Sequence, residues 1–106
     1  MRFEPQFDPV VHAPNRLQVC AMLAAVDFVE FPVLRESLGV SDSVLSKHLK
    51  VLEDAGYLVL RKATVASRVR TRVALTSAGQ AAYSGHVAEL QRLIGGTRAA
   101  VPQRQH

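Results

Sequence analysis

The chain has 106 residues, of which 48% are hydrophobic and 21% are charged, and its formal net charge is +4. This length allows one domain with a small core and is too short for two, and the composition is that of a globular protein. No run approaches the roughly eighteen apolar residues of a membrane span, and a single cysteine, Cys20, excludes an internal disulfide framework. We therefore expect a cytoplasmic protein with no membrane partner, whose positive charge permits a polyanionic partner without requiring one.

The N-terminal part of the chain predicts an arm followed by two helical segments. Residues 1–8 are polar and contain a proline, which is typical of an arm. Asp8 followed by Pro9 opens a helix, because aspartate accepts the first backbone N–H groups and proline fits the first helical position. Pro14 interrupts or restarts that helix. Residues 16–26 are apolar around most of the helix circumference, so we expect burial against the core and against a second subunit.

A helix-turn-helix is expected next. Residues 27–30 are compatible with a short strand, and Pro32 then opens a brief helix that Gly39 ends in the left-handed conformation. Ser41 caps a longer helix over residues 42–55. Two short helices joined by about three residues around a glycine have the spacing of a helix-turn-helix.

The helix over residues 42–55 has one apolar stripe and one polar face. Leu45, Leu49 and Leu52 fall within about 60° of each other and predict the buried side. The other side carries small hydroxyl groups near its start and lysines one turn apart, which suits a helix whose leading end enters a major groove; a merely solvated face is the alternative. His48 lies at the edge of the leucine stripe, so it can pack at the core, bond a phosphate, or do both.

A basic stretch at residues 61–72 carries five positive charges and no negative one. From Arg68 onward basic and apolar residues alternate, which predicts a strand with one basic and one apolar face. Residues 57–62 are also strand-like, so the two runs predict a hairpin with a loop of about five residues at 63–67. An edge hairpin whose charges only keep it soluble is the alternative. Its place behind a helix-turn-helix favours a grip on a nucleic-acid backbone.

Thr76 is expected to cap a last helix over residues 77–94, which Gly95 and Gly96 end, leaving residues 95–106 as a flexible tail. Apolar residues recur along this helix at spacings of four, three and four. A domain already closed by three helices and a sheet has little core to offer them, so we interpret the seam as a dimer surface; a helix folded back on its own subunit is the alternative. The seam consists of Tyr83, Val87, Leu90, Leu93 and Ile94.

Metal, redox and catalytic sites find little support in the sequence. His86 and Glu89 are one helical turn apart, but a tetrahedral zinc site needs more ligands, so we expect no metal and no cofactor. Cys20 lies on an apolar helix and is expected to be a buried small hydrophobe. The chain contains no Gly-rich phosphate loop and no Gly-x-Ser-x-Gly turn, so we do not expect an enzyme.

The order of helix, short strand, two helices, two strands and a last helix resembles the small bacterial winged-helix regulators of the ArsR and MarR type. The resemblance covers about residues 8–93. It is carried by Phe-Pro-Val-Leu-Arg-Glu-Ser-Leu-Gly-Val-Ser at 31–41, Leu-Ser-Lys-His-Leu-Lys-Val-Leu-Glu-Asp-Ala-Gly-Tyr at 45–57, and Leu-Thr-Ser-Ala-Gly at 75–79. The chain departs from the pattern at Ala63 and Thr64, where relatives often have a glycine that opens the wing.

The resemblance implies an α+β, mostly α, winged helix-turn-helix domain over residues 9–94, with a two- or three-stranded antiparallel wing and a C-terminal dimerisation helix at 77–94. It implies a sequence-specific transcriptional regulator, a homodimeric repressor that reads a near-palindromic promoter site in double-stranded DNA. A winged-helix module that binds protein instead of DNA is the alternative, because fold alone does not settle function. The sequence leaves any small-molecule effector open.

Together, the patterns and the resemblance predict three sets of site residues. The expected base readers are Ser43, Val44, Ser46 and Lys47. The expected contacts to the DNA backbone are His48, Lys50, Arg61, Lys62, Arg68, Arg70 and Arg72. The expected dimer interface comprises Leu17, Tyr83, Val87, Leu90, Leu93 and Ile94.

Overall fold

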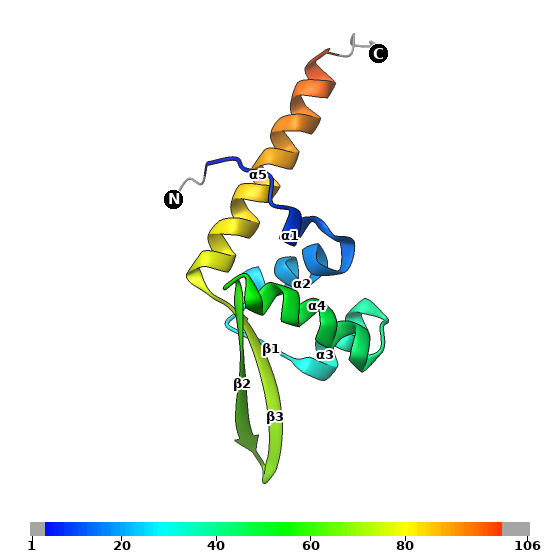
Figure 1. The fold of residues 1–106 in the computed structure, drawn as a ribbon, viewed down its shortest axis with the longest axis vertical. Helices are drawn as coiled ribbons and strands as arrows, with labels where there is room; N and C mark the ends of the chain where they lie inside the picture. Colours follow the sequence, from blue (N-terminus) through cyan, green and yellow to red (C-terminus); the bar gives the residue numbers. More distant parts are fainter. Residues whose placement is uncertain (1–3, 101–106) are drawn as a thin grey trace.

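The computed structural model describes residues 4–100, with side chains described for residues 4–95. Within that range the chain forms five helices and one three-stranded sheet in the order expected from the sequence (Figure 1). The elements are α1 (Pro9–His12), α2 (Pro14–Ala24), β1 (Val29–Glu30), α3 (Phe31–Leu38), α4 (Asp42–Asp54), β2 (Leu58–Val65), β3 (Arg68–Leu75) and α5 (Ser77–Ala100). None of the helices within this range combines the length and hydropathy needed to cross a membrane.

Helices α1 and α2 begin where the sequence predicts. The Asp8 Oδ1 accepts hydrogen bonds from the backbone N–H groups of Val10 at 2.9 Å and Val11 at 3.1 Å, which caps α1. Ala13 is extended, with φ −57° and ψ 137°, because the residue before a proline is pushed out of the helical region. Pro14 then starts α2, so the chain turns between two helices instead of continuing one.

The helix-turn-helix prediction is confirmed at its boundaries. Gly39 ends α3 with φ 68°, a conformation that costs glycine little. Ser41 caps α4 by accepting a hydrogen bond from the Val44 N–H at 3.2 Å. Gly56 follows α4 with φ 81° and turns the chain into β2.

The sheet has the strand order β1-β3-β2, with both pairings antiparallel. Pairing of β2 with β3 continues from Leu58 opposite Leu75 to Val65 opposite Arg68, which leaves only Ala66 and Ser67 as the turn. The predicted loop of about five residues is therefore wrong. Ala66 and Ser67 have φ values of 52° and 67°, and a two-residue turn with both φ values positive matches the right-handed twist of its strands.

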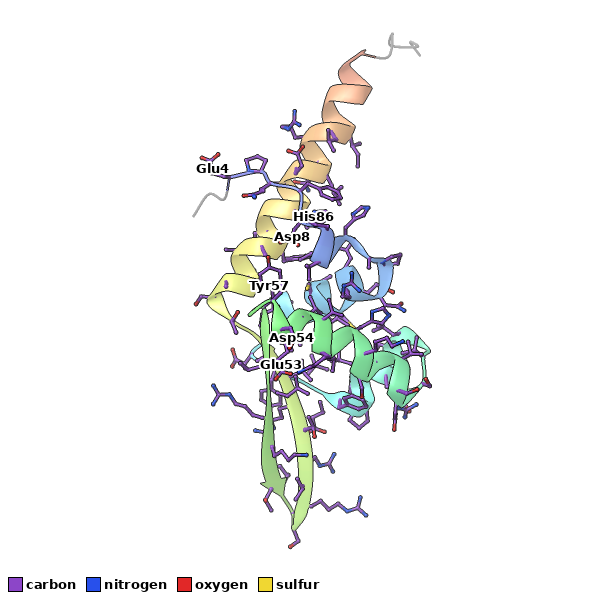
Figure 2. The ribbon with its side chains drawn as sticks, viewed as in Figure 1. Glu4, Asp8, Glu53, Asp54, Tyr57 and His86 are labelled. Carbon is purple, nitrogen blue, oxygen red and sulfur yellow. The ribbon has the colours of Figure 1, made fainter. Side chains whose placement is uncertain are left out.

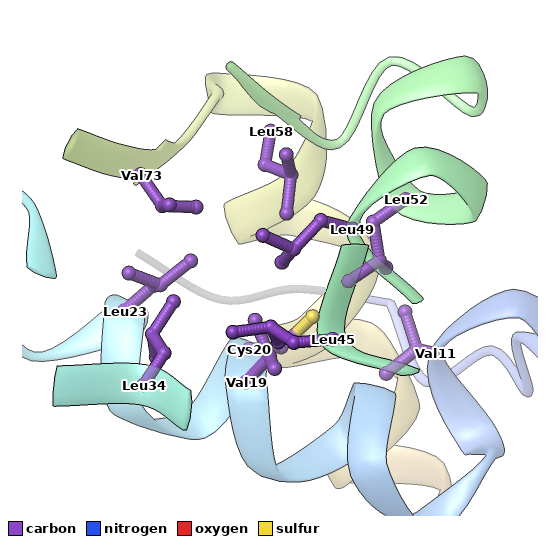
Figure 3. Close-up of a cluster of buried hydrophobic side chains, with 10 residues drawn as sticks. All are labelled: Val11, Val19, Cys20, Leu23, Leu34, Leu45, Leu49, Leu52, Leu58 and Val73. Carbon is purple, nitrogen blue, oxygen red and sulfur yellow. The ribbon is translucent and has the colours of Figure 1, made fainter. Parts of the chain in front are cut away.

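A single core lies between the helices and one face of the sheet (Figure 3). The predicted leucine stripe of α4 is buried in it, as are two side chains from the base of the hairpin. Truncating such a leucine to alanine typically costs about 2–5 kcal/mol. The core residues are Val11, Val19, Cys20, Leu23, Leu34, Leu45, Leu49, Leu52, Leu58 and Val73.

Helix α5 starts at its predicted cap but is longer than predicted. The Thr76 Oγ1 accepts a hydrogen bond from the Gly79 N–H at 3.0 Å. The helix then continues through Gly95 and Gly96 to Ala100, so the predicted end at Ile94 is wrong. Glycine in a helix interior costs only about 1 kcal/mol relative to alanine, which weakens a helix without forcing it to stop. Residues 95–100 of the predicted flexible tail thus belong to α5, and residues 101–106 lie outside the described residues.

The N-terminal arm packs on α5 over its described part, residues 4–8. The Gln6 N–H donates a hydrogen bond to the Gly85 carbonyl oxygen at 2.9 Å. Gly85 is buried, and a Cβ at that position would lie 3.0 Å from the Glu4 carbonyl oxygen. A glycine here therefore lets the arm backbone approach the helix closely.

Candidate nucleic-acid interface

The leading end of α4 is exposed, as a helix that reads DNA requires. Ser43, Val44, Ser46 and Lys47 are all exposed, while the leucine stripe on the other side is held in the core. The Ser43 hydroxyl lies 3.3 Å from the hydroxyl of the capping residue Ser41. These side chains form a short surface of hydroxyl, methyl and ammonium groups, which are the groups that contact base edges in a major groove.

His48 and Lys50, on the same helix, have partners within the protein. The His48 Nε2 lies 3.3 Å from the Asn15 side-chain nitrogen, and its Nδ1 lies 3.5 Å from the Arg16 Nη1. Burial, with the nearby charges of Arg16 and Lys47, lowers the pKa of His48 below 6.5. Lys50 forms an exposed ion pair with Asp54 at 3.1 Å, which water screens. His48 therefore has a local structural role against α2.

The pairing register places the basic residues of the hairpin on its two faces. Arg61 lies opposite Arg72, Ala63 opposite Arg70, and Val65 opposite Arg68, so all four arginines share one face of the sheet. The expected basic face of β3 is thus confirmed. Lys62 lies opposite Thr71 and projects from the other face, the one that carries Leu58 and Val73 into the core.

Two of the four arginines are held by the neighbouring strand segment. The Arg70 Nη1 and the Glu30 Oε1 form an ion pair at 3.0 Å. The Arg72 guanidinium lies 4.2 Å from the ring centroid of Phe28, a cation–π arrangement. The sequence interpretation missed Glu30 and Phe28. The available signal was their spacing. Phe28 and Glu30 are two positions apart in the predicted short strand, and residues two apart point to the same side of a sheet.

The other cations of the hairpin remain available. Arg61, Lys62 and Arg68 are exposed, and among the described residues none of them forms an ion pair. Arg68 is the first residue after the turn, at the far end of the hairpin from the core. Figure 1 shows the hairpin projecting past α3 and α4, in the direction opposite to α5.

The predicted dimer seam divides into two parts. Leu17 and Tyr83 are half-buried and pack against the core of the domain. Val87 and Leu90 are half-buried farther along α5. Leu93 and Ile94 are 46% and 56% exposed on the part of α5 that extends away from the other helices (Figure 1). The first turns of α5 therefore pack against the core, and the later turns carry apolar side chains at the surface.

The surroundings of Cys20 and Glu89 are those of structural residues. Cys20 is fully buried, as expected, and burial raises the pKa of its thiol to about 11. Glu89 accepts two hydrogen bonds from Arg92, at 2.8 and 2.7 Å. Among the described residues, no three histidine, cysteine or acidic side chains are grouped so as to hold a metal ion.

An exposed helix end beside a basic hairpin, both fixed on one small core, defines a winged-helix DNA-binding protein. Residues 15–94 match the family described as "Winged helix DNA-binding domain", and the chain belongs to this family. The uncharacterized protein MJ0432 of Methanocaldococcus jannaschii is 32% identical to the chain over 78 residues, which is 74% of this chain and 85% of that protein.

Two solved structures have a similar fold. A transcriptional regulator homologue from Pyrococcus horikoshii OT3 has a TM-score of 0.78 and 26% identity, covering 83% of this chain and 87% of that one. The zinc-responsive MarR family member ZitR of Lactococcus lactis has a TM-score of 0.63 and 21% identity, covering 87% and 62%, and shows the fold alone. The predicted winged-helix fold is confirmed, and the family with its neighbours supports a DNA-binding transcriptional regulator.

Proposed function

We propose that this protein is a homodimeric repressor of the ArsR and MarR type that occupies a near-palindromic promoter site. The observation that carries the proposal is the exposed leading end of α4 beside a hairpin whose four arginines share one face. In such an arrangement the helix enters a major groove and the wing follows the neighbouring backbone. The DNA-binding unit spans residues 9–94.

The residues at the start of α4 choose the sequence. Ser43, Ser46 and Lys47 offer hydrogen bonds to base edges, and Val44, which is 40% exposed, offers an apolar contact to a thymine methyl group. None of these side chains is needed in the core, so their chemistry is free to serve recognition.

The wing supplies affinity and salt dependence. Arg61, Lys62 and Arg68 are its strongest backbone contacts, because no protein carboxylate neutralises them within residues 4–95. Arg70 and Arg72 contribute less, since Glu30 and Phe28 hold them in the free protein. Lys50 is similarly reduced by Asp54. Each phosphate contact contributes roughly 0.9 to the slope of log affinity against log salt concentration.

The homodimer is formed through α5 and the start of α2. Leu93 and Ile94 are apolar and about half exposed, and Val87 and Leu90 continue the same seam towards the core. A two-fold dimer presents two α4 helices to half-sites about one helical turn apart, so the site it reads is near-palindromic.

The test begins with selection of bound fragments from random DNA by the full chain. An enriched near-palindrome supports the proposal. On that site, Ser43→Ala and Lys47→Ala should each weaken binding by about 1–3 kcal/mol and change binding to random DNA little. Equal losses on both DNAs would remove these residues from base readout.

A second experiment examines the wing. The combined change of Arg61, Lys62 and Arg68 to alanine should weaken binding to every sequence and reduce the salt slope by up to roughly 3. Arg92→Ala is the matched control, because it removes an arginine that is paired with Glu89 on α5. No DNA binding by the native protein at low salt would instead favour a protein-binding module.

A further inference from the structure

Two histidines and an aspartate form a hydrogen-bonded chain between the arm, α1 and α5. The Asp8 backbone N–H donates to the His86 Nδ1 at 2.9 Å, and the His86 Nε2 lies 3.0 Å from the His12 Nδ1. The Asp8 Oδ2 in turn accepts from the Tyr57 hydroxyl at 2.5 Å. Figure 2 shows Asp8 between His86 and Tyr57, at the crossing of the arm with α5. Nothing in the DNA-binding surface uses this chain.

The first donor fixes the direction of the chain. A backbone N–H can only donate, so the His86 Nδ1 carries no proton. The neutral His86 ring therefore has its proton on Nε2 and donates to the His12 Nδ1. Every link is satisfied when both rings are neutral.

One added proton breaks one of these hydrogen bonds, whichever ring nitrogen it binds. A second proton on His86 points the Nδ1–H at the Asp8 N–H, donor against donor. A proton on the His12 Nδ1 faces the His86 Nε2–H, which is again donor against donor. If the His86 hydrogen moves from Nε2 to its own Nδ1, the conflict with the Asp8 N–H returns. The Asp8 carboxylate already caps α1 through Val10 and Val11 and accepts from Tyr57.

Burial makes the His86 ring resist protonation. His86 is fully buried, and Phe7 packs on both imidazole rings with ring centroids 4.8 Å apart in each case. Burial and then His12 lower the pKa of His86, while the Asp8 charge acts in the opposite direction. His12 is exposed and connects the buried ring to solvent.

Each element that surrounds the hydrogen-bonded chain of Asp8, His86 and His12 contributes titratable or charged groups. Tyr57 stays a donor, because its hydrogen bond to Asp8 raises its pKa to about 12. Cys20 stays a neutral thiol. On α5 the Glu89 carboxylate is held by Arg92. The groups are Asp8 from the arm, His12 from α1, Arg16 and Cys20 from α2, Tyr57 ahead of β2, and Glu89 and Arg92 on α5.

We propose that the Asp8, His86 and His12 chain is an acid-sensitive latch, which holds the arm and α1 on α5 and releases them when His86 takes up a second proton. Release breaks the Asp8 bond to α5 and removes the constraint that keeps Gln6 on the Gly85 carbonyl. Because Asp8 also binds Tyr57, just after α4, the latch lies between the reading helix and the proposed dimerisation helix.

The experiment is amide hydrogen exchange of the full chain without DNA, at pH of about 7.5 and about 5, with each rate expressed relative to the intrinsic rate at that pH. The Asp8 and Gln6 amides should lose at least roughly tenfold of their protection in acid. The Leu49 and Leu52 amides, in the core, report the stability of the whole domain and should lose clearly less protection than Asp8 and Gln6. Unchanged protection at Asp8 and Gln6, or equal loss at all four amides, would overturn the latch.

Two matched variants separate the histidines. His86→Asn places an amide oxygen near the Nδ1 position and cannot titrate, so protection of Asp8 should be the same at both pH values. His12→Asn keeps an acceptor for His86 and leaves His86 titratable, so the acid loss should persist. Acid loss that persists in His86→Asn contradicts the proposal.

Ring ¹⁵N spectra of the native protein provide a test that does not depend on how either variant folds. At neutral pH His86 should carry its proton on Nε2, and it should become doubly protonated in step with the change at the Asp8 amide. A proton on Nδ1 at neutral pH, or titration of His86 that leaves the Asp8 amide unchanged, would refute the latch.

Discussion

Arg70 on β3 and Glu30 on β1 form an ion pair diagonally across the sheet, with the Arg70 Nη1 and the Glu30 Oε1 3.0 Å apart. In the strand register Glu30 lies directly opposite Arg72, so one carboxylate sits beside two of the wing arginines. The base of the wing is thereby tied to the strand that precedes the helix-turn-helix. The hairpin end that carries Arg68 has no such tie within the described residues.

This relationship predicts a graded effect of the wing arginines on DNA binding. Arg68→Ala should lower the slope of log affinity against log salt by about 0.9, the value for one phosphate contact. Arg70→Ala should lower it by less than half of that, because Glu30 already neutralises Arg70. Fluorescence anisotropy with a labelled duplex over a range of salt concentrations measures both slopes. Equal reductions would mean that Arg70 leaves Glu30 when DNA binds.

The free energy of unfolding is expected to change when the two left-handed residues of the wing turn are replaced. An L-residue in this conformation costs about 1–2 kcal/mol, and Asn-Gly is strongly preferred in turns of this type. Changing Ala66 to Asn together with Ser67 to Gly should therefore raise the free energy of unfolding by up to about 1 kcal/mol. Ala66→Val should lower it, because a branched side chain fits a positive φ poorly. Urea unfolding with an unchanged m-value measures both effects, and a destabilised Asn-Gly variant would argue for a different turn.

Two glycines of α5 should give opposite results when changed to alanine. A Cβ on Gly79 would collide with the Tyr57 carbonyl oxygen, which is backbone and cannot move aside. Gly79→Ala is therefore expected to cost more than about 2 kcal/mol, in the range of other overpacking changes. A Cβ on Gly95 would meet no atom of the described residues within 4 Å, so Gly95→Ala should stabilise the helix by about 0.5–1 kcal/mol. Thermal and urea unfolding followed by circular dichroism compare the pair.

Stability should fall as the pH is lowered below about 6.5. Burial is the first cause of the lowered pKa values of both His48 and His86, whose ordinary value is 6.5. The unfolded chain therefore takes up protons before the folded chain does. The stabilising contribution is fully present above pH 6.5 and is lost as the pH falls through the folded pKa values, with a slope of at most about 1.4 kcal/mol per pH unit for each proton. Urea unfolding at a series of pH values measures the slope, and stability that rises on acidification would contradict the assignment.

The proposed dimer surface can be tested with one charge. Leu90→Glu should give monomers, because a carboxylate would be desolvated at the centre of the apolar seam, and operator binding should weaken through lost bivalency. Gln91→Glu is the control, since it adds the same charge at the next, exposed position of α5. Sedimentation velocity distinguishes the two species. A dimer that survives Leu90→Glu would place the interface elsewhere.

Local patterns in the sequence predicted most of the fold. Asp8, Ser41 and Thr76 cap their helices because a side-chain oxygen close in sequence can reach the orphan N–H groups. The leucine stripe of α4 needed only the helical period. The predicted length of the hairpin turn and the predicted end of α5 were wrong. How far two strands pair, and whether a helix continues through two glycines, depend on cooperative interactions that a local signal does not contain.

Short-range signals along the chain were enough to establish which segments are helix or strand, where they start, and that a basic hairpin follows a helix-turn-helix. Which cations of that hairpin are available depends on packing, since Glu30 and Phe28 meet Arg70 and Arg72 only after β1 pairs with β3. Packing also brings His12 and His86, 74 positions apart, into hydrogen-bond contact. Such partners are distant along the chain, and only the assembly of the arm, α1 and α5 brings their donors and acceptors within reach.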